Sequence, residues 1–314
     1  MHPEPIRHHY IPQFILKNFC FEDRRLYYFD KQTSCVSIKD TRDVFMARNL
    51  YRDEINYAAD PVKIEKDLAE YEREIAQIIR ERFLDGREIF ITPQEDAKLK
   101  LFFAIMGFRS LNAKSSFDNT YSQHAKAYCK SYQPDGNTLD FWKRNLGYIV
   151  QCRSFEEVWN HPHIDDPINV FSCRDIVGCF GKYIAIAEAK TPNAFLIGDT
   201  YPVAVSGVLP NGLPMPMYDV FPISPQRVLF MASNGVQGTP RDVLFLREFL
   251  FQPPKYDESA NLLRIRVKKL STDEVQYLNK EVVKSAKLGV ATQQLPQKAA
   301  PALFAPVKKL GITK

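Results

Sequence analysis

The hydrophobic periodicity of the chain changes along its length, and this change constrains the fold most. Between about residues 60 and 160, apolar side chains recur every three or four residues, which is the period of an α-helix. From Cys179 onward, short apolar runs bounded by Gly and Pro are typical of strands. Residues 25–30 and a segment containing Val36 and Ile38 predict an earlier hairpin. This order favours an α+β fold, with a mixed or antiparallel sheet, an inserted helical subdomain and a closing C-terminal helix.

Two long helices are predicted in the helical subdomain. Asp60 and Pro61 suit the N-cap and the first position of a helix. One apolar stripe follows, formed by Ile64, Leu68, Tyr71, Ile75 and Ile78. Thr92 and Glu95 form a capping box, which opens a second helix with apolar residues on every side. We expect this second helix to be central in the core, so the charged Arg109 at its end needs a polar partner.

The later part of the chain predicts the sheet and the closing helix. Strands are expected at residues 183–187, 194–197, 203–206, 220–223, 227–232 and 262–267. Ser271 and Glu274 form another capping box, which starts a helix through about Leu288. We therefore expect residues 1–291 to form a single domain, in which the N-terminal strand joins the later sheet. Residues 292–314 are expected to be a basic, disordered tail rich in Pro and Ala.

Charge and hydropathy limit the partners and the location of the protein. The net charge is +5, but four of these charges are lysines in the last 25 residues, which hold no acidic residue. The folded body is therefore close to neutral, although a local basic groove could still bind nucleic acid or a nucleotide. No apolar run reaches the roughly 18 residues that span a bilayer, and the N-terminus lacks the apolar core of a signal peptide. We expect a cytoplasmic protein with no membrane partner.

The stretch from Arg7 to Phe19, with the sequence RHHYIPQFILKNF, concentrates polar groups and apolar anchors. Pro12 disfavours a helical conformation for the residue before it and is accepted in the first turn of a helix, so a strand, a turn and a short helix are predicted. His9, Tyr10 and Gln13 would then lie at a strand-to-helix junction, where functional groups are common.

This stretch resembles the opening H-Y-x-P-Q-x-x-L-x-x-F of a bacterial family of unknown function, which we call the HYxPQ family. Three other stretches are similar to that family: residues 195–202 to its F-I-T-S-D-N-P, residues 220–225 to its P-L-S-P, and residues 275–279 with Ala286 to its closing L-N…A helix. The resemblance covers about residues 8–291. It implies a bacterial defence or toxin setting and no specific activity. The turn holding Asp199 is one residue longer between Asp and Pro than the family pattern.

Each candidate residue has a functional and a structural interpretation. His9 with Tyr10 could carry acid–base chemistry, or His9 could cap a turn beside a core tyrosine. Asp199 follows Gly198 at a strand end, so it could bond its own turn backbone, bind a metal ion or orient His9. Arg109 could bind a phosphate group or form a structural ion pair with Glu65 or Glu72.

The two glutamates add a metal hypothesis. Glu65 and Glu72 flank the apolar stripe of the first helix. They could bind a divalent cation, or they could simply face water at the edge of the stripe. The candidate metal ligands are thus Glu65, Glu72 and Asp199, with Mg²⁺ or Mn²⁺ as the cation.

The leading function hypothesis is an enzyme for a phosphate-containing substrate, a nuclease for RNA or DNA. The alternative is a sensor module that binds a ligand or partner without turnover. No P-loop, G-x-G-x-x-G, G-x-S-x-G or H-E-x-x-H motif is present, which disfavours the activities of those classes. Under either hypothesis we expect His9, Gln13, Arg109 and Asp199 to converge on one pocket.

Overall fold

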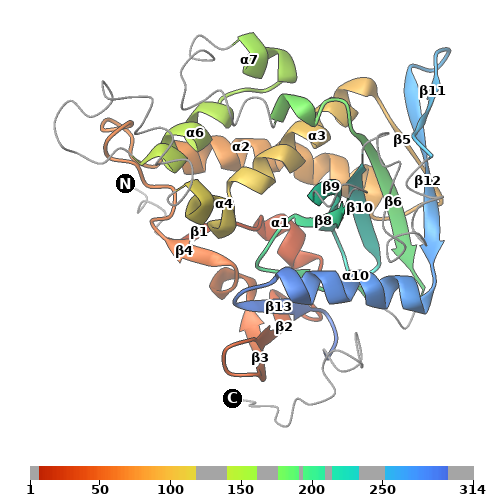
Figure 1. Ribbon diagram of the computed structural model, residues 1–314, viewed down its shortest axis with the longest axis horizontal. Helices are drawn as coiled ribbons and strands as arrows, with labels where there is room; N and C mark the ends of the chain where they lie inside the picture. The colour runs from red at the N-terminus through yellow and green to blue at the C-terminus, as the bar shows by residue number, and fades with distance from the viewer. Residues whose placement is uncertain are drawn as a thin grey trace. The chain divides into compact units, whose positions relative to one another are not determined.

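The computed structural model describes residues 7–117, 140–160, 176–190, 194–208, 214–232 and 252–295 (Figure 1). The chain divides into two compact units. The first unit comprises Met1–Tyr10, Met46–Gln77 and Ala97–Gly181, and the second comprises Ile11–Phe45, Ile78–Asp96 and Lys182–Lys314. Helices and mixed sheets give the α+β fold that the sequence predicts. The boundaries of a single domain over residues 1–291 stay a prediction.

The first unit is mainly helical. Its elements are β1 (Arg7–His9), β4 (Met46–Arg48), most of α2 (Lys63–Ile78), most of α3 (Pro93–Phe108), α4 (Leu111–Ser116), α6 (Phe141–Ile149) and α7 (Phe155–Asn160). Four of the five stripe residues of α2 are buried, and the middle of α3 is buried from Leu101 to Met106. The predicted capping box is present, because the Glu95 N–H donates to the Thr92 hydroxyl and the Thr92 N–H donates to the Glu95 carboxylate. These features confirm α3 as a core helix.

The second unit holds two sheets. In the smaller one, β3 (Cys35–Asp40), β2 (Arg25–Asp30), β13 (Gly289–Thr292) and β7 (Ile197–Gly198) lie in this order, all antiparallel. The larger sheet has the order β11 (Lys255–Asp257), β12 (Leu262–Leu270), β6 (Tyr183–Ala189), β10 (Arg227–Ala232), β9 (Pro214–Pro222) and β8 (Val203–Val208), and β5 (Glu88–Ile91) also pairs with β12. The β12–β6 pair is parallel and the other pairs are antiparallel, so the larger sheet is mixed.

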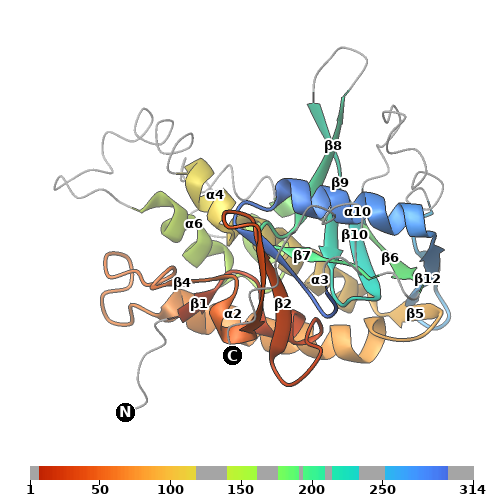
Figure 2. The ribbon, with the colours of Figure 1, turned by 90° about the horizontal axis from the view of Figure 1, so that it is seen from below.

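The remaining elements of the second unit are α1 (Gln13–Lys17), the 3-10 helix η1 (Thr41–Asp43), the π-helical turn η2 (Ile79–Phe83) and α10 (Thr272–Ser285). α10 lies against the larger sheet (Figure 2), because Val275, Leu278 and Val282 share a buried cluster with apolar residues of β6, β8 and β10. The predicted capping box at Ser271 and Glu274 starts this helix. Hydrophobic burial therefore fixes α10 on the sheet.

Several predicted boundaries are wrong, each for a local reason. α2 begins at Lys63 and not at Pro61, because residues 60–62 form a turn in which the Lys63 N–H donates to the Asp60 carbonyl. α10 ends at Ser285, since Ala286 has an extended backbone. The strand β13 then reaches Thr292, where the sequence predicted a tail. The predicted tail from residue 296 onward lies outside the described residues. The same holds for much of residues 115–133, where the sequence also predicts a helix.

The predicted pairing of the N-terminal strand with the later sheet is also wrong. β1 pairs with β4, with His8 opposite Ala47. The early hairpin β2–β3 joins the late strand β13 instead. Within the described residues, no helix has the length and apolar character needed to cross a lipid bilayer.

Candidate functional site

Arg109 is the centre of a buried polar cluster in the first unit, formed by His8, His9, Tyr51, Glu65, Glu72 and Arg109 and named here the Arg109 centre. Arg109 follows the last turn of α3 and is 1% exposed. Its Nη1 lies 2.5 Å from Oε1 of Glu72, and its Nε donates to the Tyr51 hydroxyl at 3.2 Å. Its Nη2 donates to the His9 carbonyl. The structural ion pair that the sequence allowed for Arg109 is therefore present, and it uses Glu72.

Tyr51 connects this guanidinium to the first strand. Its hydroxyl donates to the Arg109 carbonyl at 3.1 Å. The Cζ atom of Arg109 lies over the Tyr51 ring, 5.5 Å from the ring centroid. The Tyr51 N–H donates to Nδ1 of His8 at 2.8 Å, and the two rings stack with centroids 5.6 Å apart. Because Nδ1 of His8 accepts, the proton of the neutral ring is on Nε2.

The two glutamates of the Arg109 centre differ in their environments. The Glu72 carboxylate is paired with Arg109, whereas Oε2 of Glu65 is buried and has no hydrogen-bond partner among the described residues. Burial raises the pKa of Glu65 to about 7, an effect that nearby Arg109 opposes and Glu72 reinforces. Burial disfavours the charged form of Arg109, yet Tyr51, Glu72 and Glu65 hold its pKa above the ordinary value. Two carboxylates with such different surroundings are typical of acid–base sites.

The other predicted site residues are divided between the units. Tyr10 is buried in the first unit directly after β1, at 2% exposure, and Gln13 is the first residue of α1 in the second unit. Asp199 also belongs to the second unit, and Glu65 and Glu72 belong to the first. The structure thus joins the His9 backbone with Arg109, while the convergence of all four residues and a cation shared by the three carboxylates stay predictions. Within the described ranges, no group of three or more His, Cys, Asp or Glu residues is suited to hold a metal ion.

The Asp199 carboxylate accepts hydrogen bonds from the turn after α10. Oδ1 accepts from the backbone N–H groups of Lys287 at 2.9 Å and Gly289 at 3.3 Å, and Oδ2 accepts from Leu288 at 3.0 Å. The Asp199 N–H donates to the Gly289 carbonyl at 3.2 Å. These contacts support the structural interpretation of Asp199, but its partners are 88 to 90 residues away rather than in its own turn.

We expect Asp199→Asn to lower the free energy of unfolding by about 1–2 kcal/mol. The amide keeps one oxygen as acceptor, but its NH₂ group would face a backbone donor that the carboxylate now satisfies. Urea denaturation would measure the loss. The exposed Asp23, changed to Asn, is the matched control and should change stability by less than about 0.5 kcal/mol. Equal stability of the two variants would contradict the structural interpretation.

Two asparagines connect the four stretches that carry the family resemblance. Asn279 of α10 is fully buried, accepts from the Leu196 N–H at 2.9 Å and donates to the Ala194 carbonyl at 2.9 Å. Nδ2 of Asn18 donates to the Ile223 carbonyl at 2.8 Å. The closing helix is thus bonded to the Asp199 segment, and the opening stretch to residues 220–225.

Sequence reasoning missed several residues of this chemistry. His8 had a signal, because it lies beside His9 in the opening stretch. Tyr51 had none, since it lies in a turn after β4 and its partners are 43 and 58 residues away. The same applies to Arg227, the first residue of β10, which is 4% exposed and pairs with Glu188 of β6 at 2.9 Å. The roles of such residues can be recognised only in the tertiary structure, where distant segments are in contact.

The comparisons with known proteins place the chain in a family without a stated activity. No curated protein and no solved structure matches it. The family described as "Protein of unknown function (DUF4238)" matches residues 7–294, nearly the same extent as the resemblance found in the sequence. The architecture and the Arg109 centre described above are therefore those of a chain that belongs to the DUF4238 family.

Proposed function

We propose that the protein is an enzyme acting on a phosphate-containing substrate, an RNA or DNA phosphodiester, with Glu65 as the group that transfers protons. The observation that carries this proposal is the Glu65 carboxyl group. One of its oxygens is buried and has no hydrogen-bond partner in the part of the chain that the structure describes, and burial raises its pKa to about 7. The bacterial defence or toxin setting rests on the family resemblance alone.

A carboxyl group with a pKa near neutrality is suited to both halves of a hydrolytic reaction. As carboxylate, Glu65 takes the proton of an attacking water or hydroxyl group. As carboxylic acid, it returns a proton to the leaving oxygen of the phosphodiester. Glu72 is not suited to this role, because its carboxylate is held by Arg109 at 2.5 Å. Arg109 contributes a positive charge near the reacting groups.

The test is cleavage of end-labelled RNA and DNA by purified protein, with EDTA, Mg²⁺ or Mn²⁺, between pH 5 and 9. Glu65→Gln keeps the size of the side chain but cannot transfer a proton, so the rate should fall by about 100-fold or more. Glu74→Gln is the control, because Glu74 lies on the same helix in an exposed pair with Lys98. The wild-type rate should depend on an ionisation near pH 7. Absence of cleavage under every condition, or equal rates for the two variants, would contradict the proposal.

A second candidate is a sensor module that binds a phosphate-containing ligand without turnover. The specific observation in its favour is that Arg109 and Asp199, two of the predicted catalytic residues, direct their polar atoms to structural partners. The same incubations separate the candidates. A nucleotide or oligonucleotide that raises the melting temperature and is recovered intact supports the sensor, whereas a cleaved product supports the enzyme.

A further inference from the structure

We propose that a pocket around Arg227 in the second unit binds a small molecule that carries a phosphate group. The pocket has a volume of about 770 Å³, and its described lining residues all belong to the second unit, among them Asn18, Lys190, Ser224, Gln226, Arg227 and Lys269. It shares no residue with the Arg109 centre. The inference therefore does not depend on the proposed enzyme activity.

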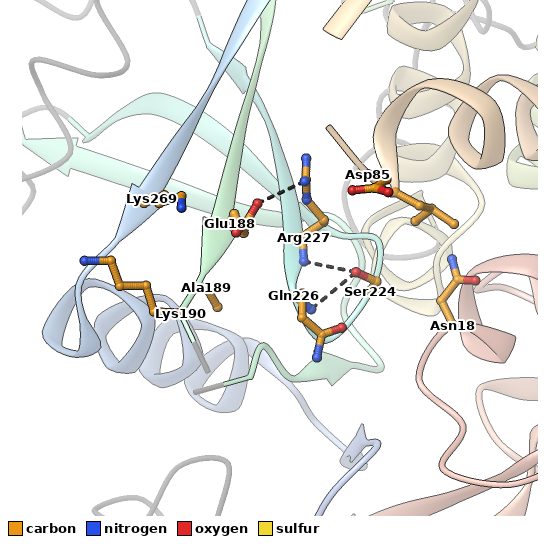
Figure 3. A pocket seen from close by; sticks show the side chains of 10 residues that line it. Asn18, Asp85, Glu188, Ala189, Lys190, Ser224, Gln226, Arg227 and Lys269 are labelled. Carbon is orange, nitrogen blue, oxygen red and sulfur yellow. Dashed lines mark hydrogen bonds and ion pairs between the residues drawn. The ribbon is translucent and has the colours of Figure 1, made fainter. Parts of the chain in front are cut away.

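Arg227 is the buried anchor of this pocket. Its Nη2 is 2.9 Å from Oε2 of Glu188 (Figure 3). The same atom donates to the Gly86 carbonyl at 2.7 Å. The Arg227 side chain is only 5% exposed. Its Nη1 is buried, yet it has no hydrogen-bond partner among the described residues. A guanidinium has five N–H donors in a planar fork, and buried donors are normally satisfied. Because Arg227 lines the pocket, its positive charge favours an oxyanion as the ligand there.

The charges around Arg227 favour an anion. Lys190, at the end of β6, and Lys269, on β12, line the same pocket and are exposed. Neither lysine side chain has a hydrogen bond or an ion pair within the described part of the chain. Lys269 lies opposite Glu188 in the parallel β12–β6 pair, and Glu188 is already matched by Arg227. The positive charges of the two lysines therefore outnumber the one remaining negative charge of the lining, that of the Asp85 carboxylate.

The neutral lining adds hydrogen-bonding groups and a defined shape. Asn18, Ser224 and Gln226 come from two of the stretches that carry the family resemblance or lie next to them. The Ser224 hydroxyl accepts from the N–H groups of Gln226 and Arg227 at 3.3 Å and 3.0 Å, which fixes the turn before β10 (Figure 3). Ligand pockets commonly have volumes of about 300–1,000 Å³. The Arg227 pocket is thus large enough for a mononucleotide-sized molecule, and several donors are available for its phosphate oxygens.

Isothermal titration calorimetry with AMP, ribose 5-phosphate and inorganic phosphate tests this inference, with adenosine as the ligand control. We expect binding of at least one phosphate compound, no binding of adenosine, and weaker binding at higher salt. The double variant K190Q/K269Q should weaken the affinity by about tenfold or more, because both charges lie at the pocket surface. Lys280→Gln, which changes an exposed lysine of α10 outside the pocket, should leave the affinity unchanged.

Two results would overturn the inference. One is the absence of heat and of any melting-temperature shift with all three phosphate compounds. The other is binding that K190Q/K269Q leaves unaltered, which would place the ligand elsewhere. The lysine variants keep the test decisive even if Arg227→Gln fails to fold, because no described contact of the fold depends on Lys190 or Lys269. Cleavage by Glu65→Gln is measured separately, so failure of one proposal leaves the other intact.

Discussion

Arg109→Ala is expected to lower the free energy of unfolding by about 3–5 kcal/mol. The guanidinium is 1% exposed and bonds to Glu72, to the Tyr51 hydroxyl and to the His9 carbonyl. Its removal leaves the Glu72 carboxylate, which is 21% exposed, without its counter-ion, and it takes one donor from the buried His9 carbonyl. Breaking a buried ion pair on one side costs more than the pair contributes, because the remaining charge stays in a poorly solvated place.

Urea denaturation of matched variants would measure this effect. Lys98→Ala is the control on the same helix, since the pair between Lys98 and Glu74 is largely exposed and worth at most about 1 kcal/mol. The double variant Arg109→Met with Glu72→Gln should recover part of the loss, because both charges are then removed together. A loss for Arg109→Ala no larger than that of Lys98→Ala would show that the Arg109 centre does not stabilise the first unit.

Stability is expected to fall as the pH rises from about 4.5 to about 7, and Glu65 is the reason. Burial raises the pKa of Glu65 from 4.5 to about 7, so between these values the folded state binds a proton that the unfolded state has lost. Stability decreases with pH wherever the folded state binds more protons. At about 1.4 kcal/mol per pKa unit, the loss at pH 8 relative to pH 4 is about 3 kcal/mol as an upper value.

Glu65→Gln should remove this pH dependence, because the amide does not titrate. In urea denaturation at pH 5, 6, 7 and 8, the free energy of unfolding of the variant should increase relative to that of the wild type, by as much as about 3 kcal/mol at pH 8. Glu74→Gln, with an exposed carboxylate, should keep the wild-type slope. Parallel curves for wild type and Glu65→Gln would mean that Glu65 titrates normally, and they would also remove the main support for its proton-transfer role.

The local features of the fold could be predicted from the sequence because they depend on neighbours along the chain. The stripe of α2, the uniform apolarity of α3 and the two capping boxes involve residues three or four positions apart. The hairpin β2–β3 was likewise predicted from its alternation and its turn. Short strands such as β5 and β13 were missed, because four residues carry too little periodicity and each strand forms only through its partner.

The candidate site was predicted less completely. The sequence indicated that Arg109 needs a carboxylate, and it named Glu65 and Glu72 as the candidates. It could not decide that Glu72 takes the ion pair while one Glu65 oxygen has no partner among the residues that the structure describes, because both glutamates flank the same stripe of α2. That difference depends on where the end of α3 meets the face of α2, which helix periodicity does not specify.

The sequence by itself determined the class of the fold, the buried faces of its helices and the need of Arg109 for a polar partner. These follow from short-range periodicity and from the high free energy of an unpaired buried charge. Only the tertiary structure decided that Tyr51 binds Arg109, that the Asp199 carboxylate accepts hydrogen bonds from the turn after α10, and that Arg227 lines a cationic pocket. Each of these contacts joins segments from 39 to 141 residues apart. The chain topology brings these segments together, and short-range sequence patterns do not specify that topology.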